Sequence, residues 1–143
     1  MRHLRLGLLP LIAITLLGCT RPPSGAPQND FYTRLQSIPA ADPVKFGSVH
    51  DFKSWRNPYL VVRKDGVSLL DVAHNEQQLL KLEELPQGLA RLALSAWPYG
   101  RVVALAEDKP IVPGDDVLIR RNRGIVAGTL ESLHILIDWV PSS

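Results

Sequence analysis

Residues 59–72 read YLVVRKDGVSLLDV, and this stretch decides the fold of the chain. Two runs rich in β-branched and apolar residues, 59–64 and 67–72, flank the dipeptide Asp65-Gly66. Such runs on both sides of Asp-Gly predict a β-hairpin, because both central residues of a type I′ turn need positive φ. We therefore expect two antiparallel strands joined at Asp65-Gly66, and a regular domain that begins at Pro58.

The segment after this hairpin fits two assignments. Asn75, followed by a glutamine at the third helical position, resembles a helix N-cap, so residues 76–85 can form a helix that breaks at Pro86. Alternatively, residues 77–81 form a strand and a helix runs from about Leu82 to Ala96, with Pro86 in its first turns, where proline is tolerated. In that helix one apolar face holds Leu85, Leu89, Leu92 and Ala96.

The last part of the chain predicts a turn, a strand, a helix and a final strand. The turn is 97–100, the buried strand is 101–107 (RVVALAE) and the last strand is 134–140 (HILIDWV), with Trp139 in the core. Asp115 and Asp116 favour a helix start, because negative charge complements the exposed N–H groups there. That helix is expected to end near Ser132, with an apolar side formed by Leu118, Ile125, Val126, Leu130 and Leu133.

Two residues inside this predicted helix are glycines, which are poor helix formers. Gly124 and Gly128 each cost about 1 kcal/mol in a helix interior. Their spacing predicts either close packing of the helix on a sheet or a break in the helix.

These elements predict an α+β fold over residues 58–143. We expect a small two-layer domain with a β-hairpin, two helices packed on a mixed sheet, and a C-terminal strand. Residues 31–57 precede it, with a short helix that ends before Pro39 and then mostly loop. Three aromatic side chains of that loop are expected to fold onto the core: Phe46, Phe52 and Trp55.

From about Tyr59 to Val140 the chain resembles the periplasmic domain of the ExbD/TolR biopolymer-transport family. The resemblance rests on 61–67 (VVRKDGV), 82–85 (LEEL), 101–103 (RVV) leading to 106–109 (AEDK), and the final helix and strand. It implies the same order of elements and an envelope-side binding domain. Family members keep an N-terminal membrane helix with an aspartate for proton-driven work, whereas residues 6–17 here contain no acid, so energy transduction is not implied.

The beginning of the chain resembles a bacterial lipoprotein signal peptide. Arg2 and Arg5 precede an apolar run at 6–17, and residues 16–19 (LLGC) match a lipobox. The run is shorter than the roughly 20 apolar residues that span a bilayer. The resemblance implies cleavage after Gly18 and a lipid anchor, such as palmitate chains, on Cys19.

The residue after the lipobox cysteine bears on localisation. Thr20 stands where an aspartate would imply retention in the inner membrane, so the periplasmic face of the outer membrane is expected. The Pro-, Ser- and Gly-rich residues 19–30 are expected to form a disordered tether about 30 Å long.

Composition limits the partners. Without residues 1–18 the chain has 125 residues and equal numbers of basic and acidic side chains, 14 of each. This neutral balance disfavours nucleic acid as a partner, which would need a basic patch or stripe. Because Cys19 is the single cysteine, no internal disulfide can form.

The sequence predicts no catalytic residues, no metal site and no cofactor. His74-Asn75-Glu76 lacks a second ligand at metal-binding spacing, so His74 is expected in a turn. The pair His50-Asp51 and the lone His134 lack a serine in a nucleophile-elbow context, and no phosphate-binding glycine loop is present.

Five residues are the predicted partner-binding candidates. Trp97 and Tyr99 lie in a predicted surface turn, and the local basic cluster is suited to anionic headgroups or cell-wall carboxylates: Arg120, Arg121 and Arg123. The leading hypothesis is a non-enzymatic envelope lipoprotein that binds another envelope protein or peptidoglycan. The alternatives are a periplasmic hydrolase or wall-modifying enzyme that uses His50-Asp51 or His134, and a structural subunit of an envelope assembly or secretion complex.

Overall fold

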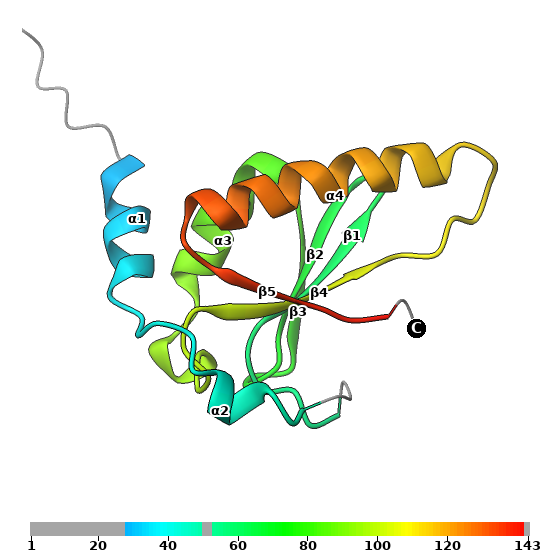
Figure 1. The fold of residues 1–143 in the computed structure, drawn as a ribbon. Coiled ribbons are helices and arrows are strands. Elements are labelled where there is room, and N and C mark those ends of the chain that lie inside the picture. Colours follow the sequence, from blue (N-terminus) through cyan, green and yellow to red (C-terminus); the bar gives the residue numbers. More distant parts are fainter. Residues whose placement is uncertain (1–27, 50–52, 142–143) are drawn as a thin grey trace, which may run out of the picture.

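A computed structural model describes residues 28–49 and 53–141 of the chain. These residues form four α-helices and five strands, in the order α1-α2-β1-β2-β3-α3-β4-α4-β5 (Figure 1). Two short 3₁₀ turns, η1 (Leu82–Glu84) and η2 (Leu94–Ala96), flank α3. The helices are α1 (Gln28–Gln36), α2 (Pro43–Phe46), α3 (Leu85–Arg91) and α4 (Asp115–Ser132). The strands are β1 (Tyr59–Arg63), β2 (Gly66–Asp71), β3 (Glu76–Leu80), β4 (Val102–Glu107) and β5 (Leu136–Trp139).

The five strands form one mixed sheet in the order β3-β2-β1-β4-β5. β1, β2 and β3 are antiparallel neighbours, whereas β4 pairs in parallel with both β1 and β5. A parallel pair needs a crossover connection, and α4 supplies it between β4 and β5. The predicted α+β class, with a hairpin, a mixed sheet and a C-terminal strand, is confirmed.

The β1–β2 hairpin forms as predicted, but its turn differs. Arg63 pairs with Gly66, so Lys64 and Asp65 are the two turn residues, and neither has positive φ. The expected type I′ turn centred on Asp65-Gly66 is therefore wrong. Gly66 instead opens β2 at φ 153°, and a Cβ there would lie 2.2 Å from the carbonyl oxygen of Leu80 on β3.

Of the two assignments for the segment after the hairpin, the one with a strand followed by a helix is confirmed. Residues 76–80 form β3, and Pro86 lies in the first turn of α3. The helix is shorter than predicted, because it ends at Arg91 and η2 forms separately at 94–96. Leu85, Leu89 and Ala96 are nevertheless buried.

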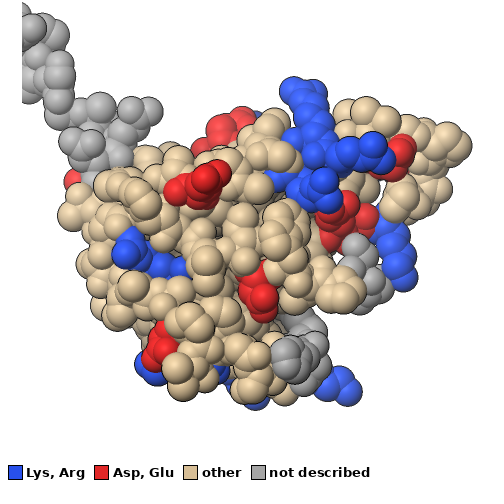
Figure 2. Space-filling model, in the orientation of Figure 1, with Lys and Arg blue, Asp and Glu red and all other residues tan. Residues whose placement is uncertain are grey.

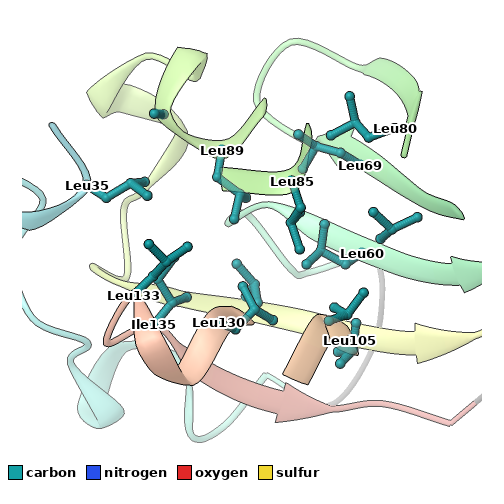
Figure 3. Packing of buried hydrophobic residues seen from close by; sticks show 14 of the residues in the cluster. Leu35, Leu60, Leu69, Leu80, Leu85, Leu89, Leu105, Leu130, Leu133 and Ile135 are labelled. Atoms are coloured by element: carbon teal, nitrogen blue, oxygen red, sulfur yellow. The ribbon is translucent and has the colours of Figure 1, made fainter. Parts of the chain in front are cut away.

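The main core fills the space between the sheet and the helices on one of its faces. Alternate residues of β1, β2 and β4 point toward α3 and α4, among them Leu60, Leu69 and Leu105. Leu85 and Leu89 of α3 meet them, as do Leu130 of α4 and Leu133 after it (Figure 3). Leu35 of α1 closes one end of this core.

The other face of the sheet carries a smaller cluster that the segment before β1 covers. Phe46 and Trp55 pack on Tyr59, Val102 and Ala104. The expectation that Phe46 and Trp55 fold onto the core is confirmed, while Phe52 lies outside the described residues.

The first described helix, α1, begins earlier than expected. α1 begins at Gln28, so residues 28–30 belong to the helix and not to the predicted tether. Asp30 in the first turn favours a helix start, but three polar residues carry no apolar periodicity that would reveal one. The helix ends before Pro39, as predicted.

α4 matches its predicted bounds, and three of the five residues of its predicted apolar side are buried: Val126, Leu130 and Leu133. The sheet-facing residues are Asp115, Ile119, Asn122, Val126 and Leu130, whereas Leu118 and Ile125 are exposed, contrary to the prediction. The helix is continuous through Gly124 and Gly128, and a Cβ at either would meet nothing within 4 Å. Neither predicted role of these glycines is correct. Among the described helices, none is both long and apolar enough to cross a membrane.

Candidate binding surface

The two predicted aromatic partner-binding residues do not form a surface with the arginines. Trp97 is only 4% exposed and packs in the main core, so its predicted surface position is wrong. Tyr99 lies with the smaller cluster, where its ring meets those of Trp55 and Phe46 at centroid distances of 5.4 and 6.4 Å. The Tyr99 hydroxyl donates to the carbonyl oxygen of Ser54 at 3.2 Å.

The three arginines of the basic cluster all lie on α4, where Figure 2 shows a group of basic side chains over this helix. Because successive helical residues are rotated by about 100°, they point in different directions. Arg120 is strongly exposed and forms a loose ion pair with Asp116 one turn earlier, at 3.7 Å. Arg121 is exposed and has no ion-pair partner among the described residues.

Arg123 belongs to a fixed cluster with Glu107 and Trp139. Its Nη1 lies 2.6 Å from Oε1 of Glu107 at the end of β4, and its guanidinium carbon lies 5.9 Å from the ring centroid of Trp139 on β5. Trp139 is 54% exposed, so the prediction of a core position is wrong. We call Arg120, Arg123 and Trp139 the Arg–Trp surface. It presents cations and one aromatic face from a helix and an edge strand.

The N-terminus of α4 is fixed to the β1–β2 turn. Lys64 Nζ donates to both carboxylate oxygens of the buried Asp115, at 3.1 and 3.2 Å. Burial acts to raise the pKa of Asp115, but hydrogen bonds from Lys64 and from the backbone N–H groups of Val112 and Ile111 outweigh it, so the pKa is lowered. Ionised Asp115 therefore holds both the turn and the preceding loop against the helix.

A second feature of α4 is its outward side, opposite the sheet. Val117 is 62% exposed, and Arg121, Gly124 and Gly128 follow it at helical spacings of four, seven and eleven residues. Leu118 and Ile125 flank this row and are exposed as well. We call these six residues the α4 crest: Val117, Leu118, Arg121, Gly124, Ile125 and Gly128.

The two histidines that the structure describes, His74 and His134, each lie within hydrogen-bond distance of an acid or a tyrosine. His74 Nδ1 lies 2.7 Å from Oδ2 of Asp71, and His134 Nδ1 lies 3.3 Å from the Tyr32 hydroxyl. The hydrogen bond that His74 donates to Asp71, and then the charge of Asp71, raise the pKa of His74. His74 lies in the β2–β3 turn, as predicted. His50 and Asp51 lie outside the described residues.

An open hollow lies at the β2–β3 edge of the sheet. It measures about 370 Å³ and is lined by Asp71, Glu76, Gln78 and Leu92. Within the described ranges, no group of three or more metal-ligating side chains surrounds it or any other point.

Two structural polar residues escaped prediction. Asn57 is fully buried, and Asn122 donates from Nδ2 to the carbonyl oxygens of Arg63 and Lys64 at 2.8 and 3.1 Å. The burial of Asn122 had a usable signal, because Asn122 lies three residues after Ile119 and four before Val126. Asn57 lies in a loop with no period, so nothing in the sequence distinguishes it.

No known family model matches this chain, and no curated protein or solved structure is significantly similar to it. The resemblance to the ExbD/TolR periplasmic domain, and the one to lipoprotein signal peptides at Leu16–Cys19, therefore stay predictions. Cys19 itself lies outside the described residues.

Proposed function

We propose that this chain is a non-enzymatic, lipid-anchored protein of the bacterial cell envelope that binds an acidic cell-wall polymer, peptidoglycan in the first place. The lipobox at residues 16–19 supports the anchor on Cys19, and Thr20 supports the periplasmic face of the outer membrane. The domain would then act as a link between membrane and wall, without chemistry of its own.

The Arg–Trp surface is the observation that carries the binding role. Trp139 is 54% exposed and its ring suits a sugar, while Arg120, whose ion pair with Asp116 is loose, suits a carboxylate. Arg123 is already paired with Glu107 and lies over the Trp139 ring. Glu107 and the cation–π contact hold Arg123 in place, which lowers the entropy lost on binding. Tryptophan and arginine are also the residue types enriched among those that dominate interface energies.

Sedimentation of the full chain with purified peptidoglycan tests this proposal. We expect the chain to pellet with the polymer, and Trp139→Ala and Arg120→Glu each to lower the bound fraction at least tenfold. Leu94→Ala is the matched control, because Leu94 is an exposed apolar residue on η2, away from α4. Loss of binding in added salt supports the role of the arginines.

Two results would contradict the proposal separately. A wild-type chain that stays in the supernatant excludes peptidoglycan as the ligand. A mature N-terminus that carries no acyl mass on Cys19 excludes the lipid anchor, whatever the binding result.

A further inference from the structure

We propose that the α4 crest is the contact between two copies of this chain, which cross antiparallel at residues 121–131. This interface lies beside the Arg–Trp surface and does not use it, so it is independent of the proposed peptidoglycan binding.

The crest is an unpartnered helix face. Val117, Leu118 and Ile125 expose apolar side chains on one helix, although the same helix buries Ile119, Val126 and Leu130 on its other side. Exposed apolar residues that lie together on one element are typical of interaction sites.

The charges on this side of α4 identify the partner as a second copy, because Glu131 follows the six crest residues on the same side and complements Arg121. Arg121 and Glu131 lie five residues on either side of Val126, and both are exposed without an ion-pair partner among the described residues. They are about 15 Å apart along the helix. In a twofold-symmetric, antiparallel crossing, residue i of one copy meets residue j of the other and the reverse. Arg121 of each copy then approaches Glu131 of the other, at both ends of the contact.

The glycines allow the two helices to approach at the centre of the same crossing. Gly124 and Gly128 each lie two residues from Val126, which is also the midpoint between Arg121 and Glu131 in the sequence. The two glycines therefore lie at the centre of the proposed crossing. Open space surrounds both positions, and small residues at a helix crossing let the two backbones come close. Each glycine costs helix stability that nothing inside the folded chain recovers.

The size of the crest sets the expected strength. A stable interface buries about 800 Å² per partner, and the crest offers only one side of an 18-residue helix. We therefore expect a reversible dimer with a dissociation constant of about 10 to 100 µM, well short of a permanent one.

Sedimentation equilibrium of the full chain in a density-matched detergent tests the dimer. We expect a monomer–dimer equilibrium in which Arg121→Glu and Glu131→Arg each raise the dissociation constant at least tenfold, because like charges then face each other. The double variant R121E/E131R restores the opposite-charge pair and should return to within threefold of the wild type. Arg91→Glu, which makes the same charge change on α3, is the control and should leave the equilibrium unchanged.

A second variant separates the contact from folding. Gly128→Leu is expected to weaken the dimer at least tenfold while the circular dichroism of the monomer stays native, since nothing within the chain lies near that position. A wild-type chain that remains monomeric at about 100 µM overturns the proposal. So does a double charge variant as weak as the single ones, or a loss of dimer in Arg91→Glu. None of these results depends on peptidoglycan binding.

Discussion

At the residue scale, Asn57 is the polar side chain on which the loop before β4 depends. Its Nδ2 donates to the carbonyl oxygens of Gly100 and Val102, each at 2.7 Å, and its Oδ1 accepts from the N–H of Tyr99 at 2.8 Å. The fully buried Asn57 side chain thereby joins the segment before β1 to the start of β4.

We expect Asn57→Ala to lower the free energy of unfolding by about 3 kcal/mol, since three buried backbone groups lose partners worth about 1 kcal/mol each. Urea denaturation measures the change. Gln87→Ala, at an exposed position of α3, is the control and should change stability by less than about 0.5 kcal/mol. Equal stability of the two variants would show that water replaces Asn57 at no cost.

His74 gives a prediction about pH at the same scale. The hydrogen bond to Asp71, and then its charge, raise the pKa of His74 from its ordinary value of 6.5. A raised pKa means that the folded state binds the proton more tightly, so the stabilisation is complete below 6.5 and is lost as the pH rises through the folded pKa.

The difference in unfolding free energy between the wild type and His74→Gln should therefore be largest near pH 5 and shrink by about pH 8. Chemical denaturation at several pH values measures it. His134→Gln is the matched control, because the His134 imidazole lies beside the Tyr32 hydroxyl and not beside a carboxylate. A difference for His74→Gln that grows with pH would mean that Asp71 stabilises the neutral ring.

At the element scale, the strands and α4 could be predicted from residue patterns. β1, β2 and β4 are apolar runs bounded by turn residues, and Asp115 and Asp116 marked the start of α4. β3 was ambiguous because Glu-Gln-Gln-Leu-Leu suits a helix as well, and its pairing with β2 decides it. The apolar side of α4 was predicted correctly at Val126, Leu130 and Leu133, but not at Leu118 and Ile125, because apolar residues lie on both sides of this helix.

The errors in the candidate surface concern the burial of two tryptophans, Trp97 and Trp139. Trp97 is the first residue of the predicted turn 97–100, but it directly follows η2 and is buried in the main core, whereas Trp139 lies on the short edge strand β5 beside Arg123. Tertiary packing decides both positions, and local patterns do not reveal it. The arginines were found because a cluster of like charges is visible without a structure.

Gly124 and Gly128 limit the stability of α4 in the monomer. Gly124→Ala and Gly128→Ala should each raise the free energy of unfolding of the monomer by up to about 1 kcal/mol, because alanine is the better helix former and the new Cβ meets no atom within 4 Å. Thermal or urea unfolding, at a protein concentration well below the dissociation constant of the dimer, measures this change in stability. Gly88→Ala in α3 is the opposite case: its Cβ would lie 2.4 Å from Cδ1 of Leu80, so it should destabilise. A loss of stability in Gly124→Ala would mean that the crest is packed within the monomer.

At the scale of the whole molecule, α1 begins on the same side as α4 (Figure 1). In Figure 1 the start of α1 and the length of α4 both lie along the upper side of the molecule. Eight residues separate Cys19 from Gln28, so a lipid on Cys19 would hold α1 within about 30 Å of the bilayer. Copies anchored in this way share a thin layer, where a weak contact is populated because the effective concentration is high.

Dimerisation in vesicles should therefore follow surface density and not bulk concentration. Tenfold more lipid at a fixed protein concentration should lower the yield of cross-linked dimer, whereas dilution of the same vesicles with buffer should leave it unchanged. Arg121→Glu should give a low yield in both series, since its crest repels a second copy at any density. A yield that falls on dilution with buffer would mean that the copies meet in solution, and the membrane anchor on Cys19 would then have no part in the assembly.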